Sequence, residues 1–391
     1  MNEQTSPRLT LEFVLTSTTK TASRMFFADN LRSTVIILVV LHHLSIIYGA
    51  NASFYYVEPH DTLATEVLGL FQLLNQAWFM GALFLISGYF TPGSFDHKGP
   101  GHFIKERLLR LGIPLVFFFF VLNPVASIGI YQMPVSLTKI TTPLTWQDYP
   151  HLLGIGPMWF VAMLLVFDFG YALWRLAARN RTEKPSTGPT MPGFIPIAVF
   201  VIILAISSYL IRIPLPLGKY ALGFPSLAYL PQYLSFFILG TIATRGNWLR
   251  TISSSMGKWG IGAALLATIV LFPLSLIGLS GSSAPFLGEG QWQSAVYALW
   301  DSIFSIGMCL ALITFFRRFF DRQGKLGSFL SQQSFTVYII HAPIIVFLAI
   351  SIRSIDLENL LKFGIAAVIG IPLCFAVAYL VRKIPYASRI L

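Results

Sequence analysis

The chain has 391 residues, of which 55% are hydrophobic and 11% are charged, and its formal net charge is +11. Soluble proteins carry about 25% charged residues, so a soluble core of this length would leave far too much apolar surface in water. This composition excludes soluble enzymes and disordered scaffolds, and it predicts an all-α integral membrane protein. Cys309 and Cys374 both lie in apolar runs, so we expect neither a disulfide framework nor a metal site.

Ten apolar segments are long enough to cross a bilayer, which takes about 20 helical residues. The predicted spans, in chain order, are residues 33–50, 66–90, 111–130, 157–177, 193–211, 224–244, 259–279, 292–316, 333–352 and 360–381. Residues 1–24 are polar, which predicts a cytoplasmic N-terminal segment and a first span that acts as an uncleaved insertion signal. Every connecting loop is too short for a soluble domain, so residues 1–391 are predicted to form a single transmembrane domain.

Lysine and arginine residues alternate between the two sides of these spans. With the N-terminus in the cytoplasm, 22 of the 27 basic residues fall in cytoplasmic segments. The five left in outer loops are Lys139, Arg212, Lys219, Arg353 and Lys362. This positive-inside bias predicts cytoplasmic N- and C-termini in a multi-pass protein of the cell membrane. The charge of +11 is therefore a topology signal, and we expect no nucleic-acid partner.

Few ionisable residues lie inside the spans, where such groups usually line a cavity or meet a partner. His43 follows Arg32 by eleven residues, about 16 Å along one face of a helix. His42 points about 100° away from that face, which favours a packing role. His341 lies eight residues into its own span, so it is expected at a similar depth, in either a structural or a site role. Asp168 and Asp301 favour helix-locking hydrogen bonds.

Six short motifs follow one another along the chain. They are Arg32 with His43, Ser87-Gly88-Tyr89-Phe90, Arg107-Leu108-Leu109-Arg110, Met158-Trp159-Phe160, Phe236-Phe237-Ile238-Leu239-Gly240, and the stretch from Ser334 to Pro343. Their types and order resemble the membrane-bound acyltransferase 3 family, and they cover residues 27–343. Within that family the chain is most similar to the glucan biosynthesis protein C-like branch. One departure stands out: no charged residue lies between Glu66 and Asp96, where the branch has basic character. This departure argues against a succinyl donor.

The resemblance implies transfer of an acyl group, of the acetyl or succinyl type, from cytoplasmic acyl-CoA to a hydroxyl of an extracytoplasmic glycan or glycolipid. It marks His43 as the essential histidine, and a neutral imidazole can act as general base for such a hydroxyl. Arg32, Arg107 and Arg110 are expected to bind the phosphates of acyl-CoA, because arginine forms bidentate hydrogen bonds with phosphate. Further site candidates are Asp29, Ser87, Gly88, Tyr89, Trp159 and His341.

Several alternatives remain open at the level of sequence. The acyl group could pass through a covalent intermediate on His43 or Ser87. Asp29 is expected to pair with Arg32 or to cap its helix. A different class of function is a secondary transporter or a glycan or lipid flippase, in which Asp168, Asp301 and the histidines would form a relay. A third possibility is a non-catalytic partner that presents substrate to another enzyme.

Overall fold

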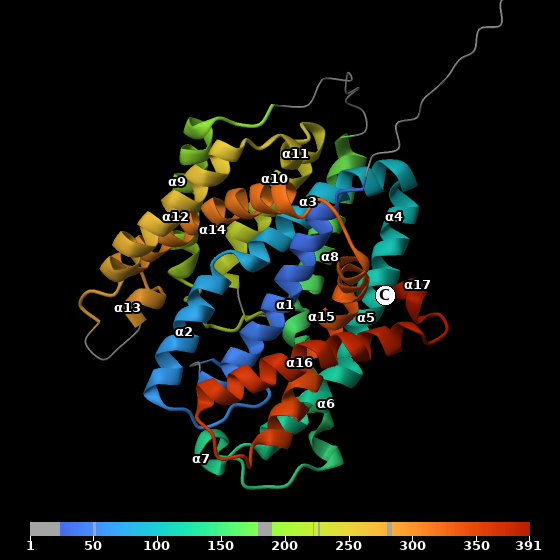
Figure 1. Cartoon of the computed structure of the whole chain (residues 1–391), viewed down its shortest axis with the longest axis vertical. Coiled ribbons are helices and arrows are strands. Elements are labelled where there is room, and N and C mark those ends of the chain that lie inside the picture. Colours follow the sequence, from blue (N-terminus) through green and yellow to red (C-terminus); the bar gives the residue numbers. More distant parts are fainter. Residues whose placement is uncertain (1–23, 50–51, 179–189, 222, 226, 280–283) are drawn as a thin grey trace, which may run out of the picture.

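The computed structural model describes residues 24–49, 52–178, 190–221, 223–225, 227–279 and 284–391 (Figure 1). The polar segment predicted for residues 1–24 therefore lies almost wholly outside the described residues. The α-helices are α1 Phe26–Gly49, α2 Thr62–Gln76, α3 Phe79–Lys98, α4 Pro100–Arg107, α5 Ile113–Phe117, α6 Asn123–Ser127, α7 Val135–Thr138, α8 Trp159–Ala177, α9 Phe194–Arg212, α10 Leu230–Arg245, α11 Trp248–Thr251, α12 Ser254–Ser275, α13 Ala284–Leu287, α14 Trp292–Phe319, α15 Lys325–Ile352, α16 Asn359–Arg382 and α17 Ala387–Ile390.

Among the described residues, ten helical segments are long and apolar enough to cross a membrane, which confirms the predicted all-α fold with about ten membrane-spanning helices. The second segment differs from the prediction, because it breaks between α2 and α3 at Ala77 and Trp78. The buried Gln232 of α10 donates a hydrogen bond of 2.6 Å to the Ala77 carbonyl. A partner from another helix thus satisfies a backbone group that the break would otherwise leave unpaired within the bilayer.

The third segment, Pro100–Gln132, is a chain of short helical pieces rather than one regular helix. Wide π turns occupy Leu108–Gly112 and Phe118–Leu122, and each ends two residues before a proline, Pro114 or Pro124. Proline has no backbone N–H and its ring crowds the carbonyl four residues earlier, so the helix widens at each of these points.

Helices α1 and α15 lie at the centre of the bundle and pack against each other. Helix α1 also contacts α2, α3, α14 and α16. In the apolar stretch of α1 and of α15 that is long enough to cross a membrane, 61% of the residues are buried, against 17% in α9 and 22% in α12. The last two helices lie together at one side of the molecule (Figure 1), where their exposed apolar faces suit contact with lipid. The two helices that carry His43 and His341 are thus the most enclosed.

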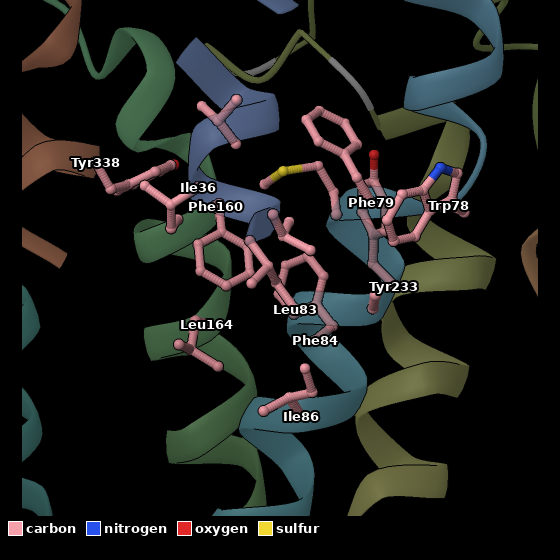
Figure 2. Close-up of a cluster of buried hydrophobic side chains, with 14 of the residues drawn as sticks. Ile36, Trp78, Phe79, Leu83, Phe84, Ile86, Phe160, Leu164, Tyr233 and Tyr338 are labelled. Atoms are coloured by element: carbon pink, nitrogen blue, oxygen red, sulfur yellow. The ribbon is translucent and has the colours of Figure 1, made fainter. Parts of the chain in front are cut away.

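An aromatic cluster fixes α3 between α8 and α10. Figure 2 shows Phe84 of α3 facing Phe160 of α8, and their ring centroids are 4.6 Å apart. Tyr233 of α10 lies 5.1 Å from Phe84 on the other side and stacks on Trp159 at 5.4 Å. Packed aromatic pairs of this kind add to the free energy of burial. Trp159, a predicted site candidate, is therefore a buried part of this cluster.

Glycines allow α3 and α10 to cross in close contact. A Cβ atom on Gly88 would lie 2.1 Å from the carbonyl oxygen of Phe237, and one on Gly240 would lie 2.3 Å from that of Leu85. Small residues at such crossings let two membrane helices approach backbone to backbone. Two of the family-like motifs, Ser87 to Phe90 and Phe236 to Gly240, thus meet at a single helix crossing.

We expect Gly88→Ala to destabilise the protein by about 1–3 kcal/mol, because the new methyl group must push the helices apart. The melting temperature of the detergent-purified protein measures this effect. Gly93→Ala is the matched control in the same helix, because a Cβ atom there meets nothing within 4 Å. Equal melting temperatures for the two variants would contradict the close crossing.

Candidate active site

A pair of histidines lies where α1 and α15 meet. His43 Nδ1 is 3.2 Å from His341 Nε2. His43 Nδ1 also lies 2.9 Å from the carbonyl oxygen of Val39, and His341 Nδ1 lies 2.7 Å from that of Tyr338. His341 is fully buried, whereas His43 is partly exposed. The structure therefore brings together two residues that are 298 positions apart in the chain.

These contacts determine which nitrogen of each neutral ring carries the proton. A carbonyl oxygen only accepts, so His341 Nδ1 must be the donor to Tyr338, which leaves His341 Nε2 as an acceptor. His43 Nδ1 faces this acceptor and the Val39 carbonyl, so it carries the proton of its ring. His43 Nε2 is then the unprotonated nitrogen, and no group of the described residues forms a hydrogen bond with it.

His42 has different neighbours from His43. Its Nδ1 lies 3.5 Å from the amide nitrogen of Asn75, and its ring lies 5.2 Å from that of Phe79. The ring of Phe54 lies 4.8 Å from that of His43. Sequence reasoning missed Phe54, because it belongs to an irregular segment without periodicity. The two adjacent histidines thus face different surroundings, as their 100° separation on the helix requires.

The segment that carries Phe54 is tied down at two further points. Glu58 Oε2 lies 2.8 Å from Lys362 Nζ, and both side chains are buried. The hydroxyl of Tyr55 donates to the side-chain oxygen of Asn123. Burial and the nearby Glu58 carboxylate raise the pKa of Tyr56 to about 12, so this phenol stays protonated at neutral pH. Lys362, which the sequence analysis placed in an outer loop, is thus a buried residue of α16 that anchors this segment.

Arg32 lies about 16 Å from His43 along α1. Its guanidinium packs over the ring of Phe90 at 5.8 Å. Contacts with α3 give a similar distance between these two levels of α1. Phe79 lies beside His42 and Phe90 lies beside Arg32, and the two phenylalanines are eleven residues, about 16 Å, apart along α3. Within the described residues Arg32 has no carboxylate partner, since the side chain of Asp29 pairs with Arg24 at 2.9 Å. The expected pairing of Asp29 with Arg32 is therefore not found.

Arg107 and Arg110 differ in their surroundings. Arg107 Nε lies 2.9 Å from Asp168 Oδ2, and Thr91 donates to the other carboxylate oxygen at 2.9 Å. Asp168 is fully buried, while the side chain of Arg107 is 23% exposed. Arg110 is 60% exposed and lies 3.5 Å from Glu106. Asp168 thus contacts Arg107 at Nε. The two terminal nitrogens of Arg107 have no partner among the described residues.

Asp301 also pairs with an arginine. Its Oδ2 lies 2.7 Å from Arg212 at the end of α9, and both side chains are buried. The guanidinium lies between the rings of Tyr229 and Tyr297, at 5.0 Å and 5.1 Å. Sequence analysis placed Arg212 in an outer loop, but the structure buries it. Both intramembrane aspartates are therefore parts of ion pairs that lock helices together.

The remaining site candidates lie on α3 and away from the histidine pair. Ser87 is partly exposed and lies eight residues, about 12 Å, along α3 from Phe79. The hydroxyl of Tyr89 lies 3.4 Å from the side-chain oxygen of Asn247. In the parts of the chain that the structure describes, no cluster of three His, Cys, Asp or Glu residues could hold a metal ion.

The sequence as a whole matches a known family of proteins. The family model described as an acyltransferase domain matches residues 25–379. The chain therefore belongs to this family of membrane-bound acyltransferases, which confirms the resemblance seen in its motifs.

Individual relatives agree with this assignment. Glucans biosynthesis protein C of Salmonella typhi is 24% identical over 368 residues, which are 90% of this chain and 91% of the relative. Glucans biosynthesis protein C of Salmonella paratyphi B is 25% identical over 370 residues, with the same coverage. The family membership favours an enzyme over the transporter and the presenting partner.

Proposed function

We propose that this protein is an O-acyltransferase of the cell membrane that moves an acyl group from cytoplasmic acyl-CoA to a hydroxyl of a cell-envelope carbohydrate. The observation that carries the proposal is the 3.2 Å contact of His43 Nδ1 with His341 Nε2, which leaves His43 Nε2 without a hydrogen-bond partner among the described residues, about 16 Å along α1 from Arg32. The names of the relatives support a glucan-type acceptor.

The donor is proposed to bind at the end of the bundle that carries Arg32, Arg107 and Arg110. Arg32 lacks a carboxylate partner among the described residues, and Arg110 is exposed. Arg107 presents its terminal nitrogens while Asp168 holds its Nε, so Asp168 acts as a positioning residue. Guanidinium groups recognise phosphates by paired hydrogen bonds. From there the thioester arm runs along α1 toward His43.

His43 is proposed to act as the general base for direct transfer. Its Nε2 takes the proton of the acceptor hydroxyl while that oxygen attacks the thioester carbonyl carbon. The C–S bond then breaks, and the imidazolium returns the proton to the leaving sulfur, which releases CoA as the thiol. During the step, His341 and the Val39 carbonyl accept hydrogen bonds from His43 Nδ1 and stabilise the cationic ring.

Direct transfer is favoured over an acyl-enzyme on Ser87. A serine nucleophile needs a base within hydrogen-bond reach. No described contact joins Ser87 to either histidine, and about 12 Å of α3 separates it from Phe79.

Mass spectrometry of envelope glycans tests the proposed function. We expect a strain without the gene to lack an ester that the parent strain carries, and a plasmid copy to restore this ester. Unchanged glycan and glycolipid esters in the deletion strain would contradict the assignment of a carbohydrate acceptor.

A further inference from the structure

A row of four aromatic rings leads from the centre of the bundle to the segment between α1 and α2. The ring centroids of His341 and His43 are 4.9 Å apart, and those of His43 and Phe54 are 4.8 Å apart. The ring of Tyr55 follows, 4.9 Å from that of Phe54. The proposed transfer step uses the two histidines and assigns no role to Phe54, which is partly exposed.

Phe54 covers one face of the His43 imidazole. The planes of the two rings are inclined by 30°, and rings so nearly parallel are too close at 4.8 Å to lie edge to edge. The lone pair of His43 Nε2 lies in the plane of the imidazole, so a ring stacked on the face leaves this nitrogen open. Phe54 thus fills space beside the proposed base without blocking it.

The backbone that carries Phe54 is held closely against the rest of the bundle. The Val57 N–H donates to Met133 Sδ at 3.1 Å. A Cβ atom on Gly129 would lie 2.7 Å from the Tyr55 carbonyl oxygen, so the two stretches of backbone are in direct contact there. These contacts hold the Phe54 ring in place.

Phe54 lies on the side of His43 from which the acceptor is expected. The segment between α1 and α2 follows the end of α1 opposite Arg32, and it lies at the same end of the bundle as α7 (Figure 1). The distribution of basic residues predicts this end to be extracytoplasmic. Water at that face far outnumbers any carbohydrate and can attack a thioester in the same way as a sugar hydroxyl. A transferase therefore has to keep water away from its base.

We propose that Phe54 is a specificity-determining residue, which makes His43 act on a carbohydrate hydroxyl and not on water. This inference rests on the proposed function. The phenyl ring occupies the space against one face of the imidazole, where water would otherwise lie beside the thioester. The acceptor reaches Nε2 at the open edge of the ring.

Without this cover, the expected side reaction is hydrolysis of the donor. The oxygen of a water molecule attacks the thioester carbonyl carbon, and His43 Nε2 takes one proton from that water. The C–S bond then breaks, and the imidazolium passes the proton to the leaving sulfur. The products are a free carboxylic acid and CoA as the thiol, with no ester on the carbohydrate.

The full-length purified protein tests the inference with acetyl-CoA as donor and a soluble glucan as acceptor. Glucan ester, free acetate and CoA thiol are measured together. Phe54→Ala should lower the ratio of ester to acetate about tenfold, which is the low end of the discrimination that one apolar contact provides. Partial loss of folded protein lowers both products equally, so this ratio distinguishes a specificity role from a structural one.

Two further variants make the test selective. Phe71→Ala is the matched control and should keep the wild-type ratio: it also removes a partly buried phenyl ring, from α2. Among the described residues, the rings that contact His43 are instead those of His42, Phe54 and His341. The double variant of His43→Gln with Phe54→Ala should form neither product above the rate without protein.

The outcomes separate this inference from the proposed function. If the wild-type protein forms the ester, an unchanged ratio in Phe54→Ala, or hydrolysis that persists in the double variant, would overturn the role of Phe54 alone. If the wild-type protein forms no ester with any envelope carbohydrate, the proposed function itself fails, and the inference fails with it.

Discussion

His43→Gln is expected to lower the rate of acyl transfer by about 10²–10⁴-fold, because glutamine keeps polarity but cannot act as a base. The measurement is ester formation per mole of detergent-purified protein, which removes differences in expression. His43 contacts the Val39 carbonyl and His341, and it is the partly exposed residue of the pair, whereas His341 is fully buried.

His42→Gln is the matched control at the neighbouring position. His42 contacts Asn75 and Phe79, not His341, so this variant should keep measurable activity with a lower yield. His341→Ala should fall between the two, because His43 would retain its base but lose the group that orients it. An active His43→Gln together with a dead His42→Gln would show that the helix face is assigned wrongly.

Arg107→Ala is expected to cost about 3 kcal/mol of stability, because it leaves the buried carboxylate of Asp168 without its cation. The same variant should raise the apparent KM for acyl-CoA. Melting temperature and donor kinetics of the purified protein measure these two effects separately.

The double variant Arg107→Met with Asp168→Asn separates a structural from a binding role for Arg107. The amide can keep the hydrogen bond from Thr91 and carries no charge, so most of the stability should return. The KM should stay high if the terminal nitrogens of Arg107 bind donor phosphate. Arg110→Ala, at an exposed position, should raise the KM without lowering the melting temperature. A double variant with normal KM would leave Arg107 as a structural lock alone.

The sequence was sufficient to predict the ten spans, because apolar runs of about 20 residues have few other structural solutions. The depth of His341 also followed from its place in its span, and the structure puts it beside His43. Helical periodicity similarly separated His42 from His43. These features depend only on position along a single helix.

Features that depend on contacts between helices could not be predicted. The break at Ala77 occurs in a continuous apolar run, and it is satisfied by Gln232 from a distant helix. The ion pairs of Asp168 and Asp301 join residues far apart in the chain, so spacing alone does not reveal their partners. Phe54 reaches His43 from an irregular segment, whose path is determined by anchors such as Glu58.

We propose that acyl-CoA on one side of the membrane acylates a carbohydrate on the other side through His43. The most direct measurement uses sealed proteoliposomes, with radiolabelled acyl-CoA at the face that carries Arg32 and a glucan at the opposite face. We predict that the wild-type protein places the label on the glucan as an ester and that His43→Gln does not. Equal labelling by His43→Gln, or transport of the glucan without esterification, would contradict this mechanism.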